Sequence, residues 1–459
     1  MIGLLWVLVA ASIPLGPATP TPWYQAVSMF RFPHIVASEF GDTDSQMLPE
    51  LRKSREEYVL VYFFAPWCPH CQHFAPEFER LALAFRRQNK SAKPEERVLA
   101  GKVDCVAHAS TCSDWGINGF PSLLWGRRTD WLERRVSTLR SVEPSSASAE
   151  GAADWINRNT PVRLDPSKVS RQEIAQLAHS GSVNSSLGFA APMDAIPTAV
   201  DPWDMQLALA LLVHETLERH GSETGPMRSL NDFVHLLAER FPEAVSSPVP
   251  NIRGAATATS CRASLRDLTR QLKPASATSG RRHAALLLEG QTQRLGPSEL
   301  ESRWRLCGTD WTTYGTRGWR SCRGTFPGKR GFTCGLWSLF HTVIAHGEDS
   351  HALEDTKIMR AVIADLFGCK DCRDHFLNHI AWSEKSTRTR RDAQIWWWQA
   401  HNQVNLRVQG IEQQYQDGDP QFPKVQWPSQ AQCPSCHVQG GWNAEAVTNF
   451  LDQYYRRRE

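Results

Sequence analysis

The sequence predicts a chain of several domains, in which an α/β domain near the N-terminus is followed by helical domains. Its 459 residues correspond to about three domains of ordinary size. Strand-like apolar runs alternate with helical patterns over residues 25–160, whereas residues 165–410 show only helical periodicity. Apolar residues make up 41% of the chain and charged residues 22%, which is ordinary for a globular protein and excludes global disorder.

The α/β domain is predicted from its apolar runs. Residues 58–65 (YVLVYFFA) form a continuous apolar run, typical of a strand that is buried on both faces of a sheet. A helical pattern follows over residues 74–85, and further strands are predicted at residues 98–103 and 122–125. This alternation of strands and helices indicates an α/β fold.

The rest of the chain is predicted to be helical. Apolar residues recur at helical spacing in five segments, namely residues 205–217, 230–241, 334–344, 357–367 and 393–408. Three stretches of small and polar residues cannot build a core and are predicted to be linkers or loops: residues 144–153, 246–260 and 274–280. The expected division is therefore an N-terminal segment (1–20), the α/β domain (25–160), a helical spacer (165–305), a second helical domain (310–430) and a tail (431–459).

The N-terminus favours export. Residues 2–13 form an apolar run of signal-peptide length, and the small residues Ala18 and Thr19 follow as a cleavage site. We expect residues 1–20 to be a signal peptide and the protein to lie in the endoplasmic reticulum or Golgi, or to be secreted; the alternative is a buried N-terminal segment.

Charge and hydropathy add two expectations. The 51 Lys and Arg residues nearly balance the 48 Asp and Glu residues, and a net charge of +3 gives no reason to expect a nucleic-acid partner. No stretch after the N-terminus reaches the ~18 apolar residues of a membrane span. The basic residues 456–458 would suit the flank of a membrane anchor if the natural chain continued beyond residue 459.

Cysteine content sets this chain apart. Of its 12 cysteines, six form C-x-x-C pairs, namely Cys68 with Cys71, Cys369 with Cys372 and Cys433 with Cys436. In an exported protein most cysteines would form disulfides, whereas in a cytosolic one such pairs would serve metal or redox chemistry. Because the pairs at 369 and 433 lie far apart in the sequence, we expect no zinc site.

The first pair lies in the motif APWCPHC, at the point where the predicted strand ends and a helix begins. A thiol at a helix N-terminus is favoured as a thiolate, and Cys71, one turn later, can resolve a mixed disulfide. The later Phe120-Pro121 fits a cis-proline loop beside such a pair. The alternatives are an ordinary disulfide or half of a zinc site; His70 either stabilises the Cys68 thiolate or is merely exposed.

These residues resemble the thioredoxin and protein-disulfide-isomerase family. The resemblance implies a thioredoxin fold with Cys68 and Cys71 as the reactive pair. The residues between the two cysteines, Pro69 and His70, depart from the Gly-His common among the isomerases.

The second pair has a helical context and no preceding strand, so it does not belong to a second thioredoxin domain. Around it the sequence has aromatic rings, amides and cations of the kind that a flavin nucleotide requires, several of them at helical spacing. These are Arg330, Trp337, His341, His375, Trp398, His401, Asn402, Asn405, Lys424 and Trp427. The alternative is that the tryptophans simply pack in a core.

Four segments resemble the Erv/ALR-type flavin-dependent sulfhydryl oxidases: RGFTCGLWSLFH (330–341), CKDCRDHF (369–376), WQAHNQVNLR (398–407) and KVQWP (424–428). The resemblance implies a helical-bundle domain that binds FAD and adds Asp371 and Val404 to the cofactor contacts. It makes Cys372 the thiol next to the flavin and Cys369 the interchange thiol. It also implies a structural disulfide between Cys322 and Cys334 and gives the Cys433/Cys436 pair no assigned role.

A thioredoxin domain joined to an Erv domain resembles the quiescin sulfhydryl oxidase family, in its single-thioredoxin form with residues 165–305 as a degenerate Erv-like spacer. The resemblance implies an FAD-dependent thiol oxidase that introduces disulfides into exported proteins. Electrons would pass from protein thiols or small dithiols through Cys68/Cys71 and Cys369/Cys372 to FAD and then to oxygen, which becomes hydrogen peroxide. Two alternatives are a flavin-free disulfide isomerase and a non-enzymatic chaperone or adaptor.

Four further cysteines are expected to form disulfides. Cys105 and Cys112 are close in sequence and are expected to bridge, which leaves Cys261 and Cys307 to pair by elimination.

Because Cys68 must face a client in one step and Cys369 in the next, we expect the two reactive pairs to meet only transiently. Residues 144–153 are the expected hinge.

Overall fold

The computed structural model describes residues 36–144, 146–180, 199–221, 223–242, 260–272, 305–307, 309, 318–325 and 328–456. The predicted signal peptide (1–20), the predicted linker at 274–280 and all of the linker at 246–260 except its last residue lie outside the described residues.

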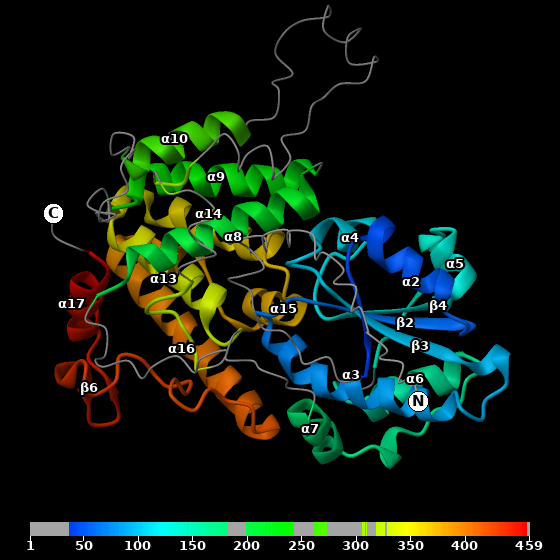
Figure 1. Cartoon of the computed structure of the whole chain (residues 1–459). Helices are drawn as coiled ribbons and strands as arrows, with labels where there is room; N and C mark the ends of the chain where they lie inside the picture. Colours follow the sequence, from blue (N-terminus) through cyan, green and yellow to red (C-terminus); the bar gives the residue numbers. More distant parts are fainter. Residues whose placement is uncertain are drawn as a thin grey trace, which may run out of the picture.

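A five-stranded sheet forms the core of the first domain (Figure 1). Its strands are β1 (Ser38–Phe40), β2 (Tyr58–Phe64), β3 (Val98–Asp104), β4 (Ser122–Arg127) and β5 (Arg140–Ser141), in the order β1-β3-β2-β4-β5. Strands β1, β3 and β2 run parallel, and β4 and β5 run antiparallel to their neighbours. All seven residues of β2 are buried, as its continuous apolar run predicts, because β2 lies at the centre of the sheet with helices over both faces.

The helices of this domain cover the two faces of the sheet. Figure 1 shows α3 and α6 on one face and α2, α4 and α5 on the other. Their bounds are α2 (Leu48–Lys53), α3 (Pro69–Gln88), α4 (Ala109–Asp114), α5 (Arg128–Leu132) and α6 (Ala149–Asn159). The arrangement is the thioredoxin fold that the resemblance implies.

The prediction of a linker at residues 144–153 is wrong for its second half. Ser148 caps α6 by accepting the backbone N–H of Gly151, and Ala149 and Ala152 are fully buried. Small side chains can mark a helix that packs closely against a neighbour as well as a segment that does not pack. Because α6 is part of the domain core, residues 149–153 do not serve as the expected hinge.

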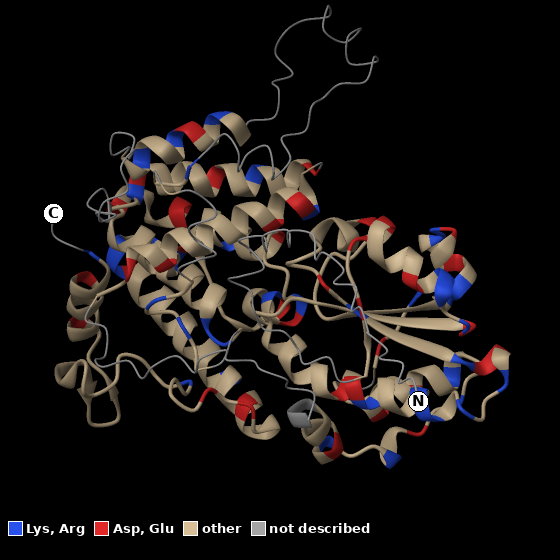
Figure 2. Ribbon diagram, viewed as in Figure 1, with Lys and Arg blue, Asp and Glu red and all other residues tan. Residues whose placement is uncertain are grey.

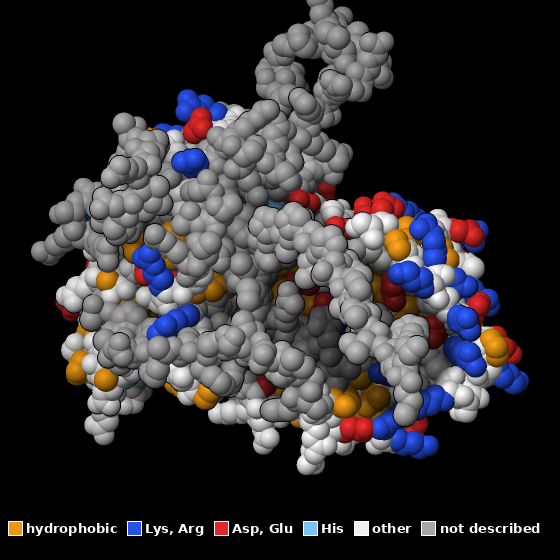
Figure 3. Space-filling model, in the orientation of Figure 1, with side chains coloured by type: hydrophobic (Ala, Val, Ile, Leu, Met, Phe, Trp, Pro, Cys, Tyr) orange, Lys and Arg blue, Asp and Glu red, His pale blue; other side chains and the backbone are white. Residues whose placement is uncertain are grey.

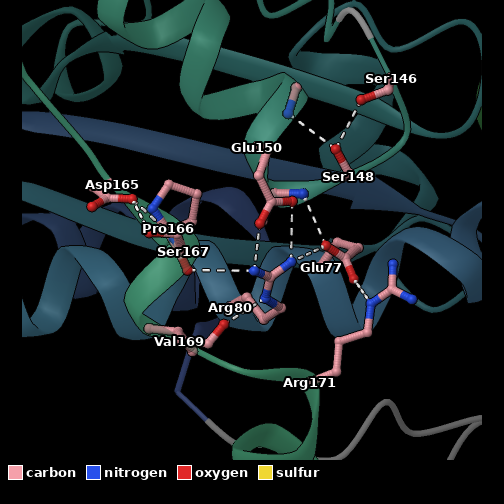
Figure 4. Close-up of polar contacts among 12 residues, drawn as sticks. Glu77, Arg80, Ser146, Ser148, Glu150, Asp165, Pro166, Ser167, Val169 and Arg171 are labelled. Carbon is pink, nitrogen blue, oxygen red and sulfur yellow. Dashed lines mark hydrogen bonds and ion pairs between the residues drawn. The ribbon is translucent and has the colours of Figure 1, made fainter.

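A network of charged side chains fastens α6 and the following segment to α3 (Figure 4). Arg80 of α3 pairs with Glu77 and Glu150, and Glu77 also accepts the backbone N–H of Ala149 at 2.9 Å. Arg171, at the start of α7 (Arg171–Ser180), pairs with Glu77 as well. Although α7 lies in the segment expected to be spacer, it therefore packs on the first domain.

The second half of the described chain is helical. Helices α8 (Pro202–His220), α9 (Thr224–Arg240) and α10 (Cys261–Leu272) pack with a group formed by α13 (Gly331–Ala345), α14 (Ala352–Asp365), α15 (Lys370–His379), α16 (Arg390–Tyr415) and α17 (Ala444–Tyr455). A short hairpin of β6 (His437–Val438) and β7 (Gly441–Trp442) precedes α17. The five helices predicted from periodicity are confirmed, with ends that differ from the prediction by up to seven residues, whereas α10 and α17 were not predicted.

Disulfides join segments within the sheet-containing domain and within the helical second half. The structure links Cys105 to Cys112 and Cys322 to Cys334, and it links Cys261 at the start of α10 to Cys307. These are the three pairs named from the sequence. Cys433 and Cys436 form a further disulfide just before the β6–β7 hairpin.

Charged residues of both signs are distributed along the elements of both halves (Figure 2). On the face drawn in Figure 3, Lys and Arg lie among Asp and Glu over the sheet-containing domain, and the described residues of this face form no large patch of one sign. In the described part of the chain, no helix has both the length and the apolar character needed to cross a membrane.

Candidate active site

The first redox pair lies where β2 meets α3. Cys68 is the N-cap residue of α3, Pro69 occupies the first turn, and Cys71 lies one turn into the helix. Both cysteines are free thiols and fully buried. The hydroxyl of Tyr62 donates to the Cys71 carbonyl oxygen at 2.9 Å, and burial raises the pKa of the Cys71 thiol well above its usual value.

The second redox pair lies directly against the first. Cys369 is the N-cap residue of α15 and is disulfide-bonded to Cys372. The sulfur atoms of Cys68, Cys369 and Cys372 all lie within 4.8 Å of one another. The structure therefore shows the two pairs together, in the arrangement that disulfide exchange between them requires; that this meeting is transient stays a prediction.

A backbone bridge holds the second pair in this place. The peptide bond between Phe120 and Pro121 is cis. Phe120 donates its N–H to the Gly368 carbonyl at 2.8 Å, and Lys370 donates its N–H to the Phe120 carbonyl at 3.2 Å. The cis-proline loop thus pairs with the residues on either side of Cys369, which fixes that sulfur in front of Cys68.

The residues between the cysteines also contact each other. His70 Nδ1 lies 3.5 Å from an Asp371 carboxylate oxygen, and Arg407 of α16 donates to His70 Nε2 at 3.1 Å. Burial, aided by Arg407 and opposed by Asp371, lowers the pKa of His70 to about 4, so the imidazole is neutral at pH 7. His70 is therefore not simply exposed, and in this arrangement it faces the second pair.

Helix α3 docks on the second domain at two more points. Gln72 donates to the Gly328 carbonyl at 2.8 Å, and His73 pairs with Asp417 at 2.6 Å. Lys329 Nζ lies 3.5 Å from the same Asp417 oxygen, Oδ2. The helix that carries the first redox pair is thus bound along its first two turns.

A cavity of about 470 Å³ lies beside Cys372. Eight of the residues expected to bind the cofactor line it: Arg330, Trp337, His375, His401, Val404, Asn405, Lys424 and Trp427. Trp337 of α13 stacks on His401 of α16, with ring centroids 4.1 Å apart and planes 2° from parallel. The pattern of aromatic and polar residues on these helices therefore lines one space.

Four expected contacts do not line the cavity. His341 bonds His401 at 3.1 Å, and burial lowers the pKa of His341 to about 3. Asn402 exchanges two hydrogen bonds of 2.8 Å with the backbone of Trp427, and Trp398 donates to the Trp427 carbonyl at 2.6 Å. These three residues hold the lining in place, whereas the fourth, Asp371, faces His70 instead.

The cavity also has walls that were not predicted. Tyr454 and Tyr455 come from α17, in the segment expected to be only a tail, and Trp67 comes from the first domain. The helical spacing of Val447, Leu451 and Tyr455, all buried, is the sequence signal that could have identified α17. No sequence signal could have placed Trp67 here, because it reaches the cavity only through the docking of the two domains.

The lining fits a flavin nucleotide. Aromatic rings are available for a planar ring system, and Arg330 and Lys424, whose pKa values burial lowers, are available for a pyrophosphate. His375 Nδ1 is buried and makes no hydrogen bond within the described residues. Buried polar atoms are normally paired, so a ligand with an acceptor or donor at this point would complete the site.

Two C-x-x-C pairs whose sulfur atoms lie close together can exchange disulfides. The cavity beside the second pair has room for an electron acceptor. A protein with these features is a thiol oxidase. Comparison with known proteins agrees: residues 42–141 match the thioredoxin family and residues 334–428 match the Erv1 / Alr family.

Several sulfhydryl oxidases are similar to this chain over most of its length. Sulfhydryl oxidase 1 of Oryza sativa subsp. japonica is 27% identical over 428 residues, which cover 89% of this chain and 75% of that protein. Sulfhydryl oxidase 2 of Arabidopsis thaliana is 26% identical over 88% of this chain and 76% of that protein. A solved sulfhydryl oxidase fragment of human QSOX1 is 27% identical and covers 56% of this chain and 95% of that one, with a TM-score of 0.42.

The thioredoxin and Erv1 / Alr matches, together with sulfhydryl oxidase relatives over most of the chain, support a quiescin sulfhydryl oxidase, an enzyme that introduces disulfides by oxidising thiols. The alternatives of a flavin-free isomerase and a chaperone or adaptor are not favoured, because the relatives that match most of the chain are sulfhydryl oxidases.

The structural disulfides yield a first prediction. We expect Cys105, Cys112, Cys322 and Cys334 to stay unlabelled by an alkylating reagent under mild reduction that labels Cys68 and Cys71 fully. Structural disulfides of exported proteins have low reduction potentials and resist reduction, whereas redox-active pairs are reduced more easily. Peptide mapping measures the order, with a denatured, fully reduced sample as control. Labelling of these four before the Cys68/Cys71 pair would contradict the assignment.

Proposed function

We propose that this chain is an FAD-dependent relay that moves electrons from protein thiols to oxygen through two C-x-x-C pairs. The observation that carries the proposal is the group of three sulfurs from Cys68, Cys369 and Cys372 within 4.8 Å of one another, beside a cavity that fits a flavin nucleotide. The substrates are reduced protein thiols and small dithiols.

The first exchange oxidises the client. A client thiolate attacks Cys68 of the Cys68–Cys71 disulfide and releases the Cys71 thiolate. The second client thiol then attacks the client sulfur, so the client leaves with a disulfide and the first pair becomes a dithiol. The position of Cys68 at the N-terminus of α3 favours its departure as a thiolate.

The second exchange passes the electrons between domains. Cys68 attacks Cys369, the Cys369–Cys372 bond breaks, and Cys372 is released as a thiolate. Cys71 then attacks Cys68 and releases Cys369, so the first pair is again a disulfide and the second pair is a dithiol. The bridge between Phe120 and residues 368–370 presents Cys369 for this attack.

The cofactor would be held by Trp337, His401 and Trp427 at its ring system and by Arg330 and Lys424 at its phosphates. A bound FAD supplies the electron acceptor for the reduced Cys369/Cys372 pair, with oxygen as the final acceptor and hydrogen peroxide as the product. Of the two cysteines only Cys372 borders the cavity, which supports its assignment as the thiol next to the flavin.

We place the enzyme in the secretory pathway or outside the cell. The support is the apolar segment at residues 2–13 and the presence of structural disulfides, which form and persist in oxidising compartments.

The cofactor is tested by purification. We expect the folded protein to be yellow and to release about one FAD per chain, because the cavity is a single site. Replacing Trp337 with alanine removes a stacked ring and should weaken retention at least about tenfold, and Asn402→Ala should weaken it by releasing Trp427. Trp155→Ala, on α6 of the first domain, is the matched control. A folded, colourless preparation with no recoverable flavin would overturn the proposal.

A further inference from the structure

Helix α8 brings two buried charges to the junction of the redox pairs. The middle of the chain shows no reactive motif in its sequence, yet Glu215 and Arg219 are only 4% and 7% exposed. They lie four residues apart and therefore on one face of the helix. Helix α8 packs against α4 of the first domain and against α13 of the second, so this face lies between the domains.

Glu215 holds the residue before the reactive cysteine. Its Oε1 atom accepts the indole N–H of Trp67 at 2.9 Å, although 148 residues separate the two in sequence. The Trp67 ring lies 4.9 Å from the ring of Phe332 and 5.2 Å from that of Phe367, measured between centroids. Because both phenylalanines belong to the second half, Trp67 is enclosed only while the domains are docked.

Arg219 contacts residues of both domains beside the two redox pairs. Its guanidinium lies 4.8 Å over the Phe120 ring and donates to the Asn118 carbonyl at 3.2 Å. A Cβ atom on Gly368 would lie 2.6 Å from Arg219 Nη1, so the guanidinium also lies against the residue before Cys369. One side chain thus orients the cis-proline loop and the second redox pair together.

These contacts can form only in the docked state. Glu215 and Arg219 attract each other along α8, and their remaining partners named above, Trp67, the loop of residues 118–120 and Gly368, come from outside this helix. Burial raises the pKa of Glu215 and lowers that of Arg219, as expected for charges enclosed away from water. When the first domain turns Cys68 towards a client, Trp67 and the loop must leave and water must take their place.

We propose that Glu215 and Arg219 are positioning residues for the interdomain exchange: they dock Trp67 and the cis-proline loop so that Cys68 faces Cys369. This inference rests on the proposed relay. The competing explanation is that the two charges only stabilise α8, in which case their removal would lower stability without changing how often Cys68 meets Cys369.

The test measures that meeting directly. In a full-length chain that carries Cys71→Ser and Cys372→Ser, both resolving thiols are absent. Equilibration in glutathione buffers of known composition gives the effective concentration of Cys68 at Cys369, from the fraction joined within one chain. We expect Glu215→Ala or Arg219→Ala to lower this effective concentration by at least about tenfold. Glu215→Gln, which keeps an acceptor for Trp67, should recover part of it.

Matched controls lie on α9. Glu239→Ala and Arg228→Ala remove the same charges from exposed positions and should leave the effective concentration unchanged. A second variant, Trp67→Phe, removes the indole N–H from the other side and leaves α8 intact. Trp67→Phe should lower the effective concentration as Glu215→Ala does. Combining the two changes should lower it by a factor smaller than the product of the two separate factors, because both changes remove the same hydrogen bond.

The outcomes separate the two proposals. If the parent chain forms no Cys68–Cys369 disulfide, the relay itself is wrong. If the parent forms it and the Glu215, Arg219 and Trp67 variants form it equally well, the positioning role is wrong and the relay stands. If the melting temperature shows that an α8 variant does not fold, Trp67→Phe becomes the deciding variant, because it removes the same hydrogen bond and leaves α8 intact.

Discussion

Replacing Cys68 with serine is expected to slow the oxidation of a reduced protein client by at least about a hundredfold, because serine cannot accept the client thiolate or attack Cys369. Cys68 is the only one of the first pair whose sulfur lies among those of the second pair in the described structure. Oxygen consumption with a reduced, unfolded protein as substrate measures the effect.

The same variant should keep a slow activity on a small dithiol. A small dithiol can reach Cys369 and Cys372 without the first domain once that domain moves aside, since no residue of the first domain carries out the later steps. A variant that oxidises protein clients as fast as the parent enzyme would show that clients reach the second pair directly.

Replacing Cys372 with serine is expected to abolish oxygen consumption with every substrate, a loss of at least about a thousandfold. Without Cys372 the second pair can neither form its disulfide nor pass electrons at the cavity, which only this cysteine of the pair borders. Cys369→Ser should have the same effect on protein clients. The measurement is the rate of hydrogen peroxide production with protein and with dithiol substrates.

The tail pair supplies the control for this result. Cys433 and Cys436 are buried, are joined to each other and lie outside the group of reactive sulfurs. The double variant Cys433→Ser/Cys436→Ser should therefore keep most of its activity on a small dithiol. Loss of that activity in a folded double variant would mean that the tail pair belongs to the relay.

Sequence periodicity predicts most of the fold because it records which residues are buried. The unbroken apolar run of β2 and the helical spacing in α13 and α16 led to elements that the structure contains. The Ala- and Ser-rich residues 144–153 misled, because small side chains serve close packing in α6 as well as loops. Composition alone does not distinguish these two uses.

The candidate site was predictable where its residues follow one another along a helix. Trp337, His401 and Asn405 came from such spacing, and they line the cavity. Glu215 and Trp67 were not predictable, since their contact depends on how two domains dock and not on any local pattern. Tyr454 and Tyr455 were predictable only in part. The amphipathic pattern of their helix could have indicated α17, but its position at the cavity depends on tertiary packing.

The central claim is that Cys68 passes electrons to Cys369 within one chain. The most direct measurement is non-reducing peptide mapping of the Cys71→Ser/Cys372→Ser variant after mild oxidation with oxidised glutathione. The account predicts that the Cys68–Cys369 disulfide, formed within single chains, is the main product. If Cys68 and Cys369 instead each carry glutathione, or are joined only between separate chains, the relay is contradicted.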